Sequence, residues 1–303
     1  MSNLTYIKHE HIDKKKWDEC VLISANGYIF ATSAYLDCMT ENWDAIVLGD
    51  YDVILPLPTR KKLSINYVYP PAFTQQLGII SKYNIDSNLV RHFLQLVSSK
   101  FKYAELILNT TNYTDQYKLT TRKNYLLDID KDYESIKKKY SRSAIRNINK
   151  AKQQKITIQT NILIEEIIKI HRSRFKDKIG VNKNDYKNLI TLLNELNKKN
   201  QILSIGAINE SGEMIAGSIF LMYKNRITFI FNGNSEVALD AGATHLLMDY
   251  VIQKFCTHNY IIDFEGSENE KFARFYEQYG AIPESYFFCK INNLPIPIKW
   301  LKQ

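Results

Sequence analysis

The sequence predicts an α/β fold with mixed sheets flanked by helices, divided into two domains. The chain has 303 residues, which corresponds to about two domains of roughly 150 residues each. It is 45% hydrophobic and 24% charged, the balance of a folded protein with sizeable cores. In the second half, helical and strand-like patterns alternate around a three-stranded meander, an order typical of a mixed sheet with helices.

In the first half we expect short strands and one clear helix. Two apolar runs, 45–48 and 53–57, flank the turn residues Gly and Asp at 49–52, so they predict a hairpin. The apolar residues of 87–101 recur with a helical period. The other expected elements are a strand end with a short helix at 28–39, a polar loop at 73–78, and strands at 104–108 and 124–129.

The second half predicts helices, a meander, and then alternating helices and strands. A charged helix is expected at 132–153, and Gly280 follows a helix at 268–279 as a C-terminal glycine. We therefore divide the chain into a domain at 1–130 and a second at 131–303. The remaining expected elements are helices at 163–176, 184–198 and 240–257, and strands at 202–208, 214–222, 226–232, 260–264 and 285–291.

Several classes of protein are disfavoured by composition. No uncharged apolar run is long enough to predict a membrane span, and residues 1–16 lack the apolar region of a signal peptide, so we expect a cytoplasmic protein. The four cysteines are scattered without a CxxC pair, which favours thiols over disulfides. The histidines show neither HxxxH nor HExxH spacing, so we expect no metal site.

The positive charge of the chain is concentrated in one stretch. Residues 131–155 contain nine basic residues against Asp132 and Glu134, a net charge of +7 in a chain whose total is +8. A local basic patch indicates an anionic partner, such as cofactor phosphates, RNA or a membrane surface. A solvated helix face is an equally good interpretation at this point.

The segment 269–281 carries the most informative motif. On a helix, Asn269, Ala273 and Tyr276 share one face, although the aromatic residues of this segment also suit a core. The segment resembles the terminal motif of the GNAT acetyltransferase superfamily, whose asparagine and alanine lie along the pantetheine arm and whose tyrosine can protonate the departing CoA thiolate. The resemblance implies cofactor contacts at Asn269 and Ala273 and a general acid at Tyr276. The matching residues are Asn269, Ala273, Phe275, Tyr276, Glu277 and Gly280.

A second GNAT landmark is the loop that binds the CoA pyrophosphate at a helix N-terminus. Here it corresponds to 239–244, where Gly242 fits the pattern and Asp240 departs from it. The resemblance implies phosphate contacts from Gly242, Ala243 and Thr244, while a plain helix start is the alternative. It also implies that Asn232 and Gly233, after the third meander strand, face the acyl donor, where an ordinary turn is the alternative.

The basic helix carries a wider resemblance. Residues 141–151 are similar to a helix of the Fem-type aminoacyl transferases, double GNAT-fold proteins that move an amino acid from aminoacyl-tRNA to a peptidoglycan precursor. Arg142, Arg146 and Lys150 are spaced to form one basic ridge that could hold phosphates or RNA. The segments 73–78 and 263–267 look like signatures of a mostly uncharacterised bacterial group of such two-domain proteins.

Glu265 follows a central strand of the second half. Ligands of open α/β sheets bind beyond the carboxyl ends of strands. A carboxylate there could act as a general base on an attacking amine, bind a substrate ammonium group, or cap the next helix, for which Ser267 is the expected N-cap.

Together these features predict two GNAT-like domains and an N-acyltransferase that moves an acyl group from acetyl-CoA or another acyl-CoA to a small-molecule or peptide amine. Glu265 and Tyr276 would carry the proton transfers. The alternatives are a Fem-like transferase that uses aminoacyl-tRNA, bound through the basic stretch 131–155, on a cell-wall precursor, and a non-catalytic binding protein of the same fold.

Overall fold

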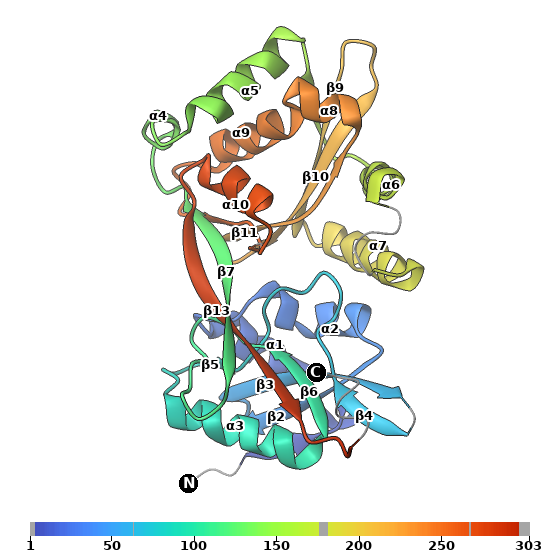
Figure 1. Cartoon of the computed structure of the whole chain (residues 1–303), viewed down its shortest axis with the longest axis vertical. Helices are drawn as coiled ribbons and strands as arrows, with labels where there is room; N and C mark the ends of the chain where they lie inside the picture. The colour runs from blue at the N-terminus through green and yellow to red at the C-terminus, as the bar shows by residue number, and fades with distance from the viewer. Residues whose placement is uncertain (1–3, 63, 176–180, 267, 297–303) are drawn as a thin grey trace. The chain divides into compact units, whose positions relative to one another are not determined.

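The computed structural model describes residues 4–62, 64–175, 181–266 and 268–296 (Figure 1). The chain forms two compact units: Met1–Arg122 together with Ser285–Gln303, and Lys123–Glu284. This division differs from the predicted one at 130. The end of the chain belongs to the first unit because strand β13 (Ile282–Asn292) pairs antiparallel with β6 (Tyr103–Ile107) of that unit.

The first unit is built on strands in the order β1-β2-β3-β4-β6-β13. The hairpin predicted at 45–57 is confirmed, since Leu48 of β2 pairs with Val53 of β3. Helix α3 covers the sheet with Val90, Phe93, Leu94 and Val97, which confirms the helical period. The remaining elements are β1 (Thr5–Ile7), α1 (Lys14–Ile23), α2 (Ser33–Met39), β2 (Asn42–Leu48), β3 (Val53–Lys62), β4 (Ile65–Val68), β5 (Ile80–Ser81) and α3 (Ser87–Lys100).

The second unit has the mixed sheet that the sequence predicts. Its strand order is β7-β12-β11-β10-β9-β8, and among the described pairings within this order only β11–β12 is parallel. The strands are β7 (Leu119–Asp128), β8 (Thr157–Thr160), β9 (Ile202–Ile208), β10 (Met214–Tyr223), β11 (Arg226–Asn234) and β12 (Ile261–Asp263). The helices are α4 (Tyr133–Lys137), α5 (Arg142–Gln153), α6 (Ile164–Phe175), α7 (Lys183–Lys198), α8 (Glu236–Ala241), α9 (Ala243–Phe255) and α10 (Glu270–Glu277).

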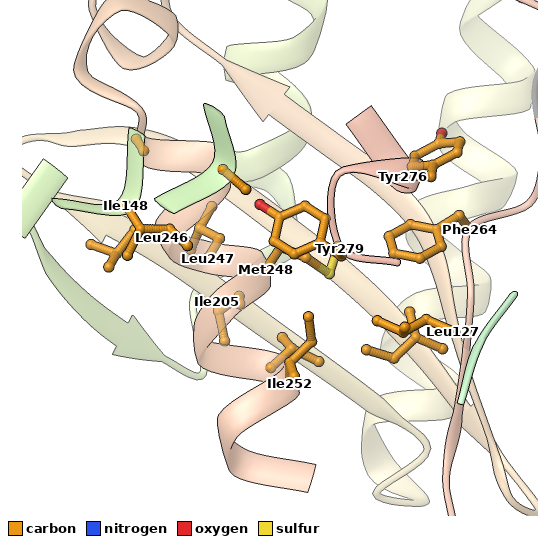
Figure 2. Packing of buried hydrophobic residues seen from close by; sticks show 14 of the residues in the cluster. Leu127, Ile148, Ile205, Leu246, Leu247, Met248, Ile252, Phe264, Tyr276 and Tyr279 are labelled. Carbon is orange, nitrogen blue, oxygen red and sulfur yellow. The ribbon is translucent and has the colours of Figure 1, made fainter. Parts of the chain in front are cut away.

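Helices cover both faces of this sheet. Within the second unit, α5, α8, α9 and α10 lie on one side and α6 and α7 on the other (Figure 1). The core between α9, α10 and the sheet contains Leu247, Ile252, Phe264 and Tyr279, whose packing is shown in Figure 2. This arrangement leaves the end of β12 beside α10, where the candidate site lies.

Three local predictions need correction. The helix expected at 132–153 is two helices, because Ser141 caps α5 through a hydrogen bond from the Ala144 amide. The helix expected at 240–257 begins at Ala243, after the short α8 and Gly242 in the left-handed region. Helix α1 was not predicted, because its lysine-rich first turn obscures the apolar face that buries Trp17.

None of the four cysteines forms a disulfide, in agreement with the predicted thiols. Within the described ranges, no helix is both long and apolar enough to cross a membrane.

Candidate active site

The candidate site begins where strands β11 and β12 stop pairing. Their parallel pairing covers only Arg226–Thr228 against Ile261–Asp263, after which β12 ends and β11 continues to Asn234. The chain that leaves β12 is held by Phe264, whose amide donates to the carbonyl of Tyr125 on β7 at 3.0 Å. Carboxyl ends of strands in open α/β sheets are where ligands bind, so the residues after Asp263 are well placed for chemistry.

Glu265 follows in an unusual backbone conformation. Its φ of 59° lies in the left-handed region, which a non-glycine residue adopts at an energetic cost and which clusters at functional sites. The strained turn is held by the Glu265 amide, which donates to Asp263 Oδ1 at 2.9 Å. Among the described residues, the buried Glu265 Oε1 has no hydrogen-bond partner. Burial, reinforced by the charge of Asp263, raises the pKa of the Glu265 carboxyl well above its usual value.

Asp263 connects this turn to β11. Its carboxylate is almost fully buried and pairs with the Arg226 guanidinium at 2.5 Å, while its second oxygen accepts the Glu265 amide. A buried carboxylate needs such partners, because an unpaired buried charge is costly. The pair therefore fixes Asp263 directly beside Glu265.

Tyr276, the second predicted catalytic residue, reaches the same place from α10. Its ring stacks on Phe264 with centroids 4.6 Å apart, and its hydroxyl end points away from Phe264 (Figure 2). Burial raises the pKa of the Tyr276 hydroxyl, and the charges of Glu265 and Asp263 add to the shift. The fold thus brings Glu265 and Tyr276, eleven positions apart in the sequence, around Asp263.

Two charged residues of this cluster were not predicted. Arg226 begins β11, and Glu284 lies near the start of β13. Burial raises the pKa of the Glu284 carboxyl; Arg226 opposes this shift and Asp263 adds to it. Glu284 Oε2 is buried and has no hydrogen-bond partner among the residues that the structure describes. Neither residue belongs to a motif, and only the register of the strands places them beside Asp263.

The basic ridge lies on a different helix. Arg142, Arg146 and Lys150 are exposed on α5, and none forms an ion pair within the described part of the chain. With Ile145, Asn149 and Gln153 they line a shallow surface depression of about 520 Å³. The opposite face of α5 buries Ala144, Ile148 and Ala151. The predicted ridge therefore exists as an exposed, positively charged surface.

The sequence matches no protein-family profile and no curated protein, but solved structures resemble the fold over nearly the whole chain. FemX has a TM-score of 0.68 at 12% identity and covers 98% of this chain and 99% of its own. L-PGS from Bacillus licheniformis has a TM-score of 0.58 at 12% identity and covers 95% of each chain. A tandem GNAT protein from the clavulanic acid biosynthesis pathway, solved without AcCoA, has a TM-score of 0.55 at 11% identity. The match covers 97% of this chain and 99% of that protein's chain. The chain has a two-domain, GNAT-like, Fem-like fold.

The predicted phosphate loop lies at the junction of α8 and α9. Gly242 and Ala243 are buried, and the Gly242 amide donates to carbonyls of α8. A Cβ on Gly242 would lie 2.3 Å from the carbonyl oxygen of Asn147 on α5. Thr244 donates to Asn234 Oδ1 at 2.7 Å. These contacts pack the start of α9 against α5. Phosphate binding by Gly242, Ala243 and Thr244 stays a prediction.

The predicted donor contacts after the meander also have packing roles. A Cβ on Gly233 would lie 2.5 Å from the carbonyl oxygen of Ile167 on α6, so glycine is needed for the close approach of that helix. The Asn232 side chain accepts from Ser218, and its carbonyl contacts His171 Nδ1. Both residues serve the interface between β11 and α6.

On α10, Asn269 accepts from the Lys271 amide and is the helix N-cap. Ala273 is buried in the core. Ser267, the predicted cap, lies outside the described residues. In the part of the chain that the structure describes, no group of three or more His, Cys, Asp or Glu is arranged to hold a metal ion.

Proposed function

We propose that the chain is an acyltransferase that moves an acyl group from an ester or thioester donor to an amine. The observation that carries the proposal is the Glu265 carboxyl beside Tyr276, at the point where β11 and β12 separate; its buried Oε1 has no hydrogen-bond partner among the described residues. The Fem-like fold supports it, because a tandem GNAT protein and FemX share this architecture.

The proposed chemistry needs two proton transfers. The amine nitrogen attacks the acyl carbon, a C–N bond forms, and the nitrogen loses a proton to Glu265. The bond from the acyl carbon to the leaving oxygen or sulfur then breaks, and the Tyr276 hydroxyl protonates that atom. A raised pKa makes the Glu265 carboxylate a stronger base than an exposed glutamate, and it keeps Tyr276 protonated at neutral pH. Solvent returns the proton from Glu265 to the phenolate.

For the donor we favour an aminoacyl-tRNA. The exposed ridge of Arg142, Arg146 and Lys150 offers nucleic-acid phosphates three cations that form no ion pair with any described residue. Acyl-CoA, which the sequence favoured, is the second candidate. The solved tandem GNAT protein described without AcCoA supports it, whereas the Gly242 amide, expected to contact its pyrophosphate, already donates to carbonyls of α8.

The test is a transfer assay with both donors. The purified chain is incubated with a mixed pool of aminoacyl-tRNAs, or with acetyl-CoA and longer acyl-CoAs, and with a panel of primary amines that includes lysine-containing peptides. Deacylation of tRNA or release of CoA thiol is followed together with the new amide. We expect amine-dependent transfer from aminoacyl-tRNA, lost in Glu265→Gln. Transfer from acyl-CoA alone would overturn the donor assignment.

Absence of transfer with every pair, together with no stabilisation by any donor in a thermal-shift titration, would favour the non-catalytic alternative. The matched control is Glu210→Gln. Glu210 is an exposed glutamate that pairs with Lys155, and its substitution is expected to leave transfer unchanged.

A further inference from the structure

The left-handed turn at Glu265 is closed by a side chain. Glu265 has φ 59°, and a non-glycine residue keeps such a backbone conformation only where its surroundings over-determine it. The Glu265 amide donates to Oδ1 of Asp263, two residues back in the chain, at 2.9 Å. An aspartate that accepts from the second amide after it forms a turn in which its carboxylate replaces a backbone carbonyl. The conformation of Glu265 therefore depends on where the Asp263 carboxylate is held.

The Asp263 carboxylate is held from the neighbouring strand. Its Oδ2 accepts from Nη1 of Arg226, the first residue of β11, and the Asp263 side chain is buried. The strand register explains this contact. Thr228 pairs with Asp263, and Arg226, two residues before Thr228, points to the same face of the sheet. One carboxylate thus connects β11 to the turn after β12, at the position where the two strands stop pairing.

Phe264 provides a second set of contacts to the same turn. Its amide donates to the carbonyl of Tyr125 at 3.0 Å, and its ring stacks on Tyr276. These contacts anchor the residue before Glu265, whereas Asp263 accepts from the Glu265 amide itself. If the Phe264 contacts were sufficient to hold the turn, a change at Arg226 would leave Glu265 unaffected.

Charge links the same three residues. Burial raises the pKa of the Glu265 carboxyl, and the charge of Asp263 adds to that shift. The Arg226 guanidinium balances the Asp263 charge, and a buried carboxylate without such a partner is costly. Arg226 therefore stabilises a negative charge beside Glu265, and this charge makes the Glu265 carboxylate a stronger base.

We propose that Arg226 and Asp263 are a positioning pair for Glu265. Arg226 fixes the Asp263 carboxylate, and Asp263 holds the Glu265 backbone in its left-handed turn beside Tyr276. Neither member of the pair is assigned a contact with the substrate, because both act through Glu265. This inference rests on the proposed function, in which Glu265 takes a proton from the amine, and it adds the two residues that orient this base.

Hydrogen exchange of the Glu265 amide, followed by NMR on the full chain, tests the pair without turnover. Arg226→Gln is expected to speed this exchange by about tenfold or more, while the amides of β9 and β10 keep their rates. Arg226→Lys, which keeps the charge, should restore most of the protection. The matched control is Arg274→Gln, because the exposed Arg274 pairs with Glu270 at 3.0 Å and its loss should change no rate. Unchanged exchange of the Glu265 amide in Arg226→Gln would overturn the proposal.

A second variant covers the case in which Arg226→Gln does not fold, since that change leaves the buried Asp263 charge without this partner. The double variant Arg226→Gln/Asp263→Asn removes both charges and keeps a side-chain oxygen for the Glu265 amide. Its glutamate carboxyl carbons are titrated by ¹³C NMR, with the Glu265 signal identified by its absence in Glu265→Gln. The titration midpoint of Glu265 should fall by about half a pH unit or more relative to the parent. A midpoint that does not fall would contradict the pair.

The transfer assay adds a kinetic readout. Arg226→Gln should lower kcat by about tenfold or more and leave the KM for the amine within about threefold, because the pair orients the base and does not bind the amine. Arg226→Lys should regain most of kcat. An equal loss of kcat in Arg226→Gln and Arg226→Lys, with a higher KM in both, would indicate a merely structural role and reject the positioning pair.

The outcomes also separate this inference from the proposed function. Exchange of the Glu265 amide that depends on Arg226, in a chain that transfers no acyl group, would retain the pair's hold on Glu265 and reject the transferase. Transfer that is lost in Glu265→Gln but insensitive to Arg226→Gln would retain the transferase and reject the positioning pair.

Discussion

The carbonyl oxygen of Asn147 lies 2.3 Å from the position that a Cβ atom would occupy on Gly242. Gly242 also adopts φ 74°, in the left-handed region. Helix α5 therefore packs on the junction between α8 and α9 at a distance that only glycine permits. This contact makes the predicted phosphate loop part of a helix–helix interface.

Gly242→Ala should accordingly destabilise the second unit by about 2 kcal/mol or more, from the backbone strain and the clash together. Denaturant unfolding measures the effect. Gly212→Ala is the control, because Gly212 has φ 82° but open space at the Cβ position, so it reports the strain alone. Equal decreases in the free energy of unfolding for the two variants would mean that α5 does not constrain Gly242.

Tyr276→Phe should lower turnover by about a hundredfold or more while changing donor affinity little, because it removes a proton donor but keeps the ring that stacks on Phe264. Single-turnover kinetics separates the two effects. Phe275→Leu, a change in a partly buried neighbouring ring, is a control for disturbance of α10. Unchanged turnover in Tyr276→Phe would remove the hydroxyl from the mechanism.

The Glu265 carboxyl should make stability depend on pH. Burial raises the pKa of this carboxyl in the folded state above the ordinary value of 4.5. The stability that the protonated form contributes is therefore fully present below pH 4.5. It is lost as the pH rises through the folded-state pKa. The free energy of unfolding of the parent chain should therefore fall relative to Glu265→Gln as pH rises from 4.5. Parallel pH profiles for the two proteins would contradict the assignment.

His245 should give the opposite pH dependence. Burial lowers its pKa from 6.5 to about 4, and its Nδ1 lies 2.8 Å from the Tyr279 hydroxyl. The stability that the neutral ring contributes is present above pH 6.5 and is lost as pH falls through about 4, by roughly 3 kcal/mol at most. An NMR titration of the imidazole measures this pKa directly. A value near 6.5 would show that the ring is hydrated.

The α5 ridge should determine how binding of nucleic acid responds to salt. Replacing Arg142, Arg146 and Lys150 by alanine should weaken tRNA binding and reduce the slope of log K against log salt by about 2–3, since each phosphate contact contributes about 0.7–0.9. The control replaces Lys183, Lys187 and Lys199, three exposed lysines at α7. Equal effects of the two triple variants would indicate non-specific attraction.

Much of the fold follows from local patterns. The meander β9–β11 and helix α3 were predictable because their apolar residues repeat with strand or helix periods. The break between α4 and α5 was missed, because the basic residues continue through it and only the Ser141 cap marks it. The return of β13 to β6 depends on a pairing between segments far apart in the sequence, which no local pattern encodes.

The candidate site was predictable in part. Glu265 and Tyr276 were predicted because one follows a strand and the other lies in a motif, and the structure places both around Asp263, while their catalytic roles stay predictions. Arg226 and Glu284 could not be found, because a single charged residue at the end of a strand resembles any solvent-facing residue. Their burial depends on strand register, which the sequence alone does not specify.

The pairing of β13 with β6 has a consequence for synthesis on the ribosome. Cys289 of β13 pairs with Leu106 of β6. Strand β6 is therefore synthesised first and lacks this partner strand until all of Lys123–Glu284 has been translated. The second unit, continuous in the chain, can complete its folding first, as domains generally do during translation. Until the last strand arrives, the nascent protein carries an open strand edge, the kind of edge that pairs with other chains. Messages truncated before codon 288 should therefore yield a protein that aggregates although its second unit is whole.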